Sequence, residues 1–272
     1  MKTQIFYFSG TGNSLYIAKE LANRIPNVTL TPIVGELSKA TIISAADSIG
    51  FIFPIHAFTI PKVVKDFLNK LKLTSNPYIF AVATRGGSPC KVFKHINNIL
   101  KKSGKELDAH FFVNMPNNYL PAFEIPTIEE IAALEVETEK QITIIKDAIV
   151  NKQKSKEKDS HSSFIEENIL FPILTQVFHK TRYFNMQNKF YCDAKCTGCG
   201  VCSKVCLSGK ITISEGKPIW NNCIDCMHCL ACIHYCPAKS IQLLKTKTPL
   251  KDRYHHKNID YKSIASQKNL VR

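Results

Sequence analysis

The sequence predicts an α/β protein in which a doubly wound sheet of five parallel strands is followed by a small α+β domain. Two observations support this class. Over the first 150 residues, short apolar runs rich in β-forming residues alternate with segments of helical periodicity. Ten of the eleven cysteines then fall between Cys192 and Cys236, in two runs of the same spacing. A chain of 272 residues that is 44% hydrophobic is long enough for two such domains.

The first strand and helix are expected at residues 2–8 and 14–25, where an apolar run, a glycine-containing turn and a helical pattern follow one another. The same alternation continues to residue 150. Further strands are expected at residues 28–34, 48–53, 78–83 and 109–113, and further helices at residues 61–71, 91–102 and 126–150. Strands that alternate with helices in this way form a parallel sheet with helices on both faces.

The rest of the chain differs in composition. Residues 151–163 contain no apolar residue and are expected to form a linker or an exposed helix end. The apolar segment after them is expected to pack between two domains. The expected units are residues 1–150 for the α/β domain, 151–189 for the linker and connecting segment, 190–244 for the cysteine-rich domain and 245–272 for a basic C-terminal tail.

Part of the net charge of +14 lies in the C-terminal tail, where residues 245–272 hold eight basic and two acidic side chains. Such a tail is either solvated and without a role, or it docks on a partner protein that has an acidic face. The basic residues form no nucleic-acid-binding motif, which argues against nucleic acid as the partner. No apolar stretch is long enough to span a membrane and no secretory signal is visible, so we expect a cytoplasmic protein with reduced thiols.

The cysteine-rich region contains one four-cysteine spacing twice. Each cysteine of the first run has a counterpart 30 residues later in the second run. The runs are Cys196-x2-Cys199-x2-Cys202-x3-Cys206 and Cys226-x2-Cys229-x2-Cys232-x3-Cys236-Pro237. Repetition of this length indicates two copies of one supersecondary unit folded against each other.

This spacing predicts two [4Fe–4S] clusters. Three thiolates separated by two residues each can bind three irons of one cubane, while the fourth cysteine of each run reaches the cluster of the other copy. The assigned ligands are Cys196, Cys199, Cys202 and Cys236 for the first cluster, and Cys206, Cys226, Cys229 and Cys232 for the second. Zinc is the alternative for paired cysteines, although its sites have longer spacers between the pairs. Cys192 and Cys223 do not follow the repeat and are expected to be free thiols.

On these residues, the region 190–244 resembles a bacterial two-cluster ferredoxin domain. One position departs from the pattern, because Leu207 follows Cys206 where that family usually has proline. The turn that carries Cys206 to the distant cluster is therefore expected to be less rigid.

A glycine-containing loop, Ser9-Gly10-Thr11-Gly12-Asn13-Ser14, connects the first strand to the first helix. Its small residues let backbone N–H groups close around a phosphate, and the hydroxyls of Ser9, Thr11 and Ser14 add donors at the start of a helix. No lysine follows as in a Walker A loop, and the third glycine of the dinucleotide fingerprint is absent. The alternative is a strand-to-helix turn that binds no ligand. The S-x-T-G-x-S pattern resembles that of flavodoxins, which bind the phosphate of FMN without a basic residue.

The flavodoxin resemblance also implies where the flavin ring would lie, beyond the carboxyl ends of the third and fourth strands. There, His56 or Phe58 would cover a face of the ring, and Thr84, Gly86 and Gly87 would reach its edge. The loops depart from flavodoxins, which usually stack tryptophan or tyrosine on the ring and surround it with acidic residues. The single tryptophan of this chain, Trp220, lies in the cysteine-rich region instead.

Over most of its length the chain resembles the fused flavodoxin–ferredoxin proteins of bacteria. The resemblance implies electron transfer between two [4Fe–4S] clusters and FMN, with a second protein as the redox partner. Two alternatives remain open. One is an FMN-dependent reductase with its own substrate pocket, in which His56 is the available proton donor. The other is a non-catalytic iron–sulfur sensor or a nucleic-acid-associated protein that uses the basic tail.

Overall fold

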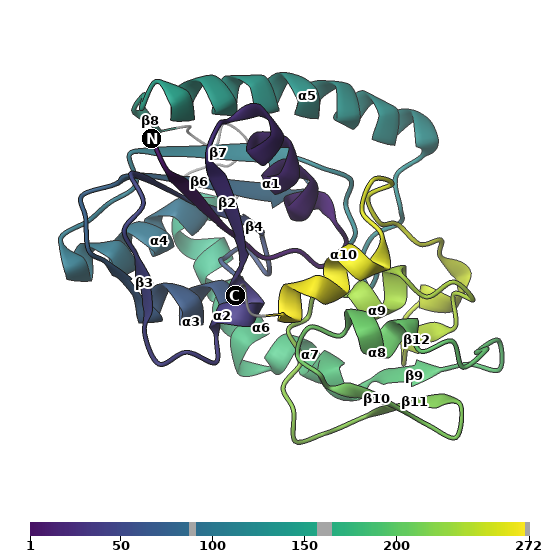
Figure 1. Ribbon diagram of the computed structural model, residues 1–272. Helices are drawn as coiled ribbons and strands as arrows, with labels where there is room; N and C mark the ends of the chain where they lie inside the picture. The colour runs from purple at the N-terminus through teal and green to yellow at the C-terminus, as the bar shows by residue number, and fades with distance from the viewer. Residues whose placement is uncertain (87–90, 157–164, 270–272) are drawn as a thin grey trace.

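The computed structural model describes residues 1–86, 91–156 and 165–269, and a six-stranded parallel sheet lies at its centre (Figure 1). The order across the sheet is β2-β1-β4-β6-β7-β8. The strands are β1 (Thr3–Tyr7), β2 (Val28–Pro32), β4 (Ser48–Pro54), β6 (Tyr78–Arg85), β7 (Ala109–Asn114) and β8 (Ser155–Lys156). Without the short β8, and counted along the chain, the order is 2-1-3-4-5, which is the order of flavodoxin-like folds. The predicted doubly wound parallel sheet is confirmed, with six strands instead of five.

Helices cover both faces of this sheet. Figure 1 shows α1 and α5 on one face and α3 and α4 on the other. The bounds are α1 (Asn13–Arg24), α2 (Ile33–Glu36), α3 (Lys62–Lys70), α4 (Val92–Leu100) and α5 (Ile128–Val150). A small parallel pair, β3 (Ile42–Ser44) and β5 (Leu71–Leu73), lies beside them. The long α5 begins with a capping box, in which Thr127 and Glu130 satisfy each other's backbone N–H groups.

The continuous apolar sequence of the central strands follows from burial on both faces. All residues of β6 are buried, as are all of β4 except Pro54. Gly50 on β4 has no side chain because a Cβ there would overlap the ring of Phe80 on β6. Parallel strands end at one edge of a sheet, so the loops after β1, β4, β6 and β7 lie together.

The cysteine-rich region forms two small antiparallel pairs with a short helix in each repeat. The elements are β9 (Phe190–Cys192), α8 (Val201–Val205), β10 (Ile211–Ser214), β11 (Lys217–Trp220), α9 (Ala231–His234) and β12 (Ile241–Leu243). β10 pairs with β11, and β12 pairs with β9. The helices α8 and α9, and likewise the strands β10 and β12, begin 30 residues apart, so the two repeats of the sequence fold alike.

The basic C-terminal segment folds back across the rest of the chain instead of extending from it. It contains α10 (Tyr261–Ala265), which Figure 1 shows beside α8 and α9. Tyr254, Ile259 and Ile264 are buried. Lys251 is buried as well, and its ammonium donates to the backbone carbonyls of Leu120 and Phe123, at 3.0 and 2.9 Å.

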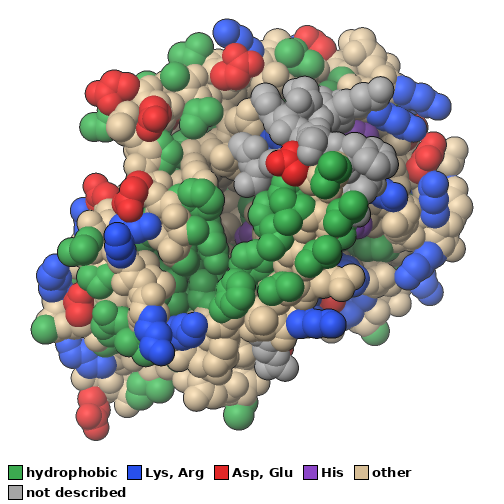
Figure 2. All heavy atoms as spheres, turned by 180° about the vertical axis from the view of Figure 1, so that it is seen from behind, with side chains coloured by type: hydrophobic (Ala, Val, Ile, Leu, Met, Phe, Trp, Pro, Cys, Tyr) green, Lys and Arg blue, Asp and Glu red, His purple; other side chains and the backbone are tan. Residues whose placement is uncertain are grey.

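The segment before the cysteines forms α6 (Phe171–Lys180), which follows a π-helical turn (Glu166–Leu170), and then α7 (Arg182–Asn185). The Phe171 ring stacks on Phe58, with ring centroids 4.7 Å apart. Several apolar side chains of this segment remain exposed, and Figure 2 shows apolar side chains gathered around a hollow in that face. Across the described residues, no helix is both long enough and apolar enough to cross a membrane.

Two expectations need correction. Residues 151–163 were expected to be a linker or an exposed helix end, but Ser155 and Lys156 form β8, paired in parallel with Ala109 and His110 of β7, and residues 157–163 lie outside the described residues. A two-residue strand on a sheet edge needs no apolar pattern, so the sequence does not reveal it. The second correction concerns the lengths of the elements. Several expected helices and strands extend one or two residues beyond the bounds that the structure shows. For example, the expected helix at residues 91–102 is an α-helix only over Val92–Leu100.

Candidate functional site

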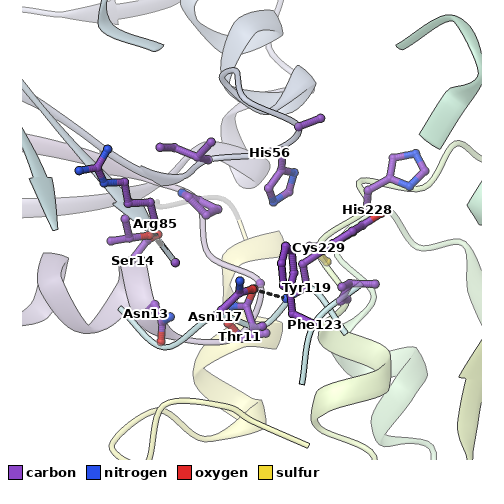
Figure 3. A pocket seen from close by; sticks show the side chains of 18 of the residues that line it. Thr11, Asn13, Ser14, His56, Arg85, Asn117, Tyr119, Phe123, His228 and Cys229 are labelled. Atoms are coloured by element: carbon purple, nitrogen blue, oxygen red, sulfur yellow. Dashed lines mark hydrogen bonds between the residues drawn. The ribbon is translucent and has the colours of Figure 1, made fainter. Parts of the chain in front are cut away.

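A pocket of about 270 Å³ lies where the carboxyl edge of the sheet meets the cysteine-rich region (Figure 3). This volume is near the lower end of the range for small-molecule sites. The walls come from three parts of the chain. They are the loops after β1, β4, β6 and β7, the α6–α7 segment with Phe178 and Tyr183, and the loop of His228, Cys229 and Leu230.

The loop after β1 forms one end of this pocket. Of its predicted site residues, Ser9, Thr11, Asn13 and Ser14 line the pocket, and Gly12 does not. The hydroxyl of Ser9 is fully buried, and no hydrogen-bond partner for it exists among the described residues. Within the same part of the chain, the backbone N–H groups of Gly10, Thr11 and Gly12 donate no hydrogen bond. These free donors at the N-terminus of α1 suit an anion.

Gly12 has a structural reason for being glycine. Its φ of 101° lies in the left-handed region, which side chains rarely adopt. A Cβ at this position would also lie 2.9 Å from the Cβ of Ile259 and 3.0 Å from that of His256. Gly12 therefore permits the C-terminal segment to pack on the outside of the loop.

The other side chains of the loop are held by neighbouring loops. Thr11 accepts a hydrogen bond from the amide of Asn118, which leaves its own O–H available to a ligand. Ser14 and Thr84 share a hydrogen bond of 2.8 Å between their hydroxyls. Thr84, predicted to reach the ring edge, thus also fixes the loop to β6. Asn13 donates to the carbonyl of Pro116 at 3.2 Å.

Most of the residues predicted to lie beside a flavin ring line the pocket. His56, Phe58 and Gly86 line the pocket, whereas Gly87 lies outside the described residues. Burial, with a smaller contribution from the charge of His228, lowers the pKa of His56 to about 3. Its imidazole is therefore neutral at physiological pH.

Sequence reasoning missed Phe123 and Tyr183, two aromatic side chains of the pocket. Tyr119 and Phe123 come from the loop after β7, and Tyr183 comes from α7. The Tyr183 ring stacks on the imidazole of His228, with ring centroids 4.1 Å apart. Burial raises the pKa of Tyr183 to about 12, so its phenol stays protonated. These residues lie in three separate stretches of sequence, and only the fold brings them together.

The eight cysteines of the two runs line two small cavities. We call them the outer set and the inner set. The outer set is Cys196, Cys199, Cys202 and Cys236, and the inner set is Cys206, Cys226, Cys229 and Cys232. Each cavity therefore takes three cysteines from one run and the fourth from the other run. Cys192 and Cys223 line neither of the two.

The thiols of both sets are held in surroundings that disfavour a bare negative charge. Burial raises the pKa of Cys202 and of Cys226 to about 11, and that of Cys229 to about 12. Thiols of the same set add to each shift by mutual repulsion. Each set therefore needs a positively charged group to become thiolate, as metal binding would provide. In the described part of the chain, no three His, Cys, Asp or Glu side chains lie close enough to ligate a single metal ion.

The pocket and the inner set share a wall. Cys229 lines the pocket on one side and the inner cavity on the other, and Figure 3 shows it projecting from the cysteine-rich region beside Tyr119. Gly10 of the first loop lies against the same residue, because a Cβ at Gly10 would overlap the carbonyl oxygen of Cys229. A ligand in the pocket would thus lie directly beside a group bound by the inner set.

Comparisons with known proteins give only remote similarities. No protein-family model matches this chain, and no curated protein matches it. Among solved structures, it is similar to a putative flavoprotein from Bacteroides uniformis (20% identity, 42% of this chain, 90% of that chain, TM-score 0.32). General stress protein 14 from Treponema denticola, solved in complex with FMN, shares 14% identity over 55% of this chain and 99% of its own, with a TM-score of 0.38. Flavodoxin from Megasphaera elsdenii shares 17% identity over 40% of this chain and 84% of its own, with a TM-score of 0.30. Similarities of this size assign neither a family nor an activity to the chain.

Proposed function

We propose that this protein transfers electrons between two [4Fe–4S] clusters and an FMN, all bound to one chain. The observation that supports the proposal most directly is the position of Cys229, which lines both the pocket and the inner cavity. A flavin exchanges one or two electrons and a cluster exchanges one, so contact between their sites lets electrons pass within the molecule.

The residues of the first loop fit the phosphate of FMN. The buried Ser9 hydroxyl lacks a partner among the described residues, and the N–H groups of residues 10–12 are free there. A phosphate would supply the acceptors that these donors need, and the N-terminus of α1 favours its negative charge. The ring would then extend along the pocket toward Tyr119 and Cys229.

The cysteine sets favour clusters over zinc. A zinc ion holds four sulfurs at about 2.3 Å from itself, and hence about 3.8 Å from one another. No group in the described chain is that compact. A cubane binds each thiolate to a different iron, and the sharing of cysteines between the two runs in each cavity suits such a cluster.

The outer set is the proposed entry point for electrons from another protein. Cys199 is exposed, whereas Cys202 and Cys236 of the same set are buried. Exposure of one ligand brings a cluster close to a docking partner. The chain has a net charge of +14, which favours a redox partner with an acidic face.

Anaerobic purification followed by chemical analysis tests the proposal. We expect about eight iron and eight sulfide per chain, in two clusters of four each, together with one FMN. Riboflavin lacks the phosphate and should bind at least about tenfold more weakly than FMN. Bound zinc without sulfide would exclude the clusters, and equal affinity for the two flavins would exclude the phosphate site.

The variant Ser9→Ala tests the phosphate site more closely. Loss of one hydroxyl that bonds to a charged group should weaken FMN binding by roughly tenfold and leave riboflavin binding unchanged. Ser48→Ala is a matched control, because Ser48 is as fully buried as Ser9 and lines neither the pocket nor the two cysteine cavities.

A further inference from the structure

We propose that Gln267 is a positioning residue for the phosphate loop, and that the C-terminal segment of residues 254–267 thereby gives the pocket its preference for a phosphorylated flavin. The inference rests on the proposed function, since it concerns the same pocket. It adds that the preference depends on side chains that do not touch the ligand.

Gln267 forms a two-way hydrogen bond with the backbone of Ser9. Its side-chain oxygen accepts from the N–H of Ser9 at 3.0 Å, and its amide nitrogen donates to the carbonyl of Ser9 at 2.8 Å. Both residues are fully buried. The ladder of β1 ends at Tyr7, so Gln267 gives Ser9 the pair of bonds that a neighbouring strand would otherwise give.

The same segment holds the loop at two further residues. The N–H of His256 donates to the carbonyl of Thr11 at 2.9 Å, and the hydroxyl of Tyr254 donates to the side-chain oxygen of Asn13 at 2.8 Å. The ring of His256 also stacks on Tyr16 of α1, with ring centroids 3.9 Å apart. The C-terminal segment thus binds every second residue from 9 to 13.

These bonds have an electrostatic consequence for an anion. The carbonyls of Ser9 and Thr11 are both engaged by groups of the C-terminal segment, and neither Gln267 nor His256 lines the pocket. Two negative ends of peptide dipoles are therefore turned away from the ligand. The Ser9 hydroxyl and the N–H groups after it remain for the phosphate. Without Gln267, the Ser9 peptide can rotate and present its oxygen to the pocket.

The experiment uses the full-length chain with its clusters intact and its flavin removed. FMN and riboflavin are titrated separately by fluorescence quenching. Gln267→Met keeps the size of the side chain and removes both hydrogen bonds. We expect FMN binding to weaken about tenfold and riboflavin binding less than about twofold. Gln4→Met is the matched control, because the amide of Gln4 also makes two hydrogen bonds, with Thr31 and Ser44, and lies outside the pocket, so neither affinity should change.

A second variant keeps the test decisive if Gln267→Met does not fold. Tyr254→Phe removes only the hydroxyl that bonds to Asn13 and should weaken FMN about threefold, again without an effect on riboflavin. Equal weakening of both flavins in either variant would overturn the inference, because it would mean general support of the fold. If the unaltered protein binds the two flavins equally, the proposed phosphate site itself is wrong, which is a distinguishable result.

Discussion

The outer and inner cysteine sets have the same spacing in sequence and different surroundings in the fold. The cavity of the outer set is walled by the cysteine-rich region alone, whereas Cys229 of the inner set also faces the pocket and contacts the first loop. Their surroundings differ again at positions 30 residues apart. Ser240 bonds to the sulfur of Cys236 in the outer set, and the buried Lys210 lines the inner cavity. A repeat thus determines ligand spacing, while contacts with the rest of the chain determine what each copy can do.

Replacing one cysteine of each set should have the largest effect. Cys199→Ser and Cys229→Ser should each lose about four of eight irons. Only Cys199→Ser should still allow rapid reduction of the flavin by the remaining cluster, because that cluster is beside the pocket. Iron analysis and stopped-flow absorbance measure these two properties. If the flavin were reduced at the same rate in both variants, the inner set would not be the one that passes electrons to the pocket.

A methyl group at Gly10 should separate the inner set from the pocket. Because a Cβ there would overlap the Cys229 carbonyl, Gly10→Ala should lower the free energy of unfolding by about 1–3 kcal/mol. The control is Gly104→Ala, where nothing lies within 4 Å and the only cost is a φ of 68°. Thermal unfolding measures the stability of both variants and of the unaltered protein. If Gly10→Ala leaves the free energy of unfolding unchanged, the contact contributes nothing measurable.

The smallest expected effect concerns Lys210. Its ammonium donates to the carbonyls of Asn221 and Ile224 at 2.7 and 2.9 Å. Its positive charge stabilises a reduced cluster, so Lys210→Met should lower the potential of the inner cluster by roughly 60 mV, a tenfold change for one electron. Ser240→Ala should lower the reduction potential of the outer cluster by less, because this substitution removes only a hydrogen bond to the sulfur of Cys236. Potentiometric titration followed by electron paramagnetic resonance measures the two reduction potentials separately. If Lys210→Met shifted the potentials of both clusters, the inner and outer sets would not differ in their surroundings as described.

Much of the fold could be predicted from the sequence because its signals are local or repeated. The order of strands and helices follows from periodicity, and the loop of residues 9–14 from its small residues between a strand and a helix. The grouping of Cys206 with the second run followed from the repeat together with the ligand pattern of two-cluster sites. Each of these signals lies within a few residues or recurs at a fixed interval.

The rest of the site depends on contacts that leave no local pattern. Tyr254, Ile259 and Ile264 are scattered among lysines, so the sequence does not reveal that they are buried against the N-terminal half. Tyr119 and Tyr183 meet in the pocket from positions 64 residues apart. Burial of this kind is decided by how whole units pack, which periodicity within one segment does not report.

The bond between Ser9 and Gln267 joins residues 258 positions apart, and this has a consequence for how the protein is made. Synthesis proceeds from the N-terminus, and early segments begin to fold before late ones exist. The sheet can form once Lys156 has been added, but the loop that follows its first strand has to wait for Gln267. The pocket thus includes one of the first parts of the chain to be translated and is among the last to be completed, so we expect a ribosome-bound chain to form the sheet before this loop is held in place.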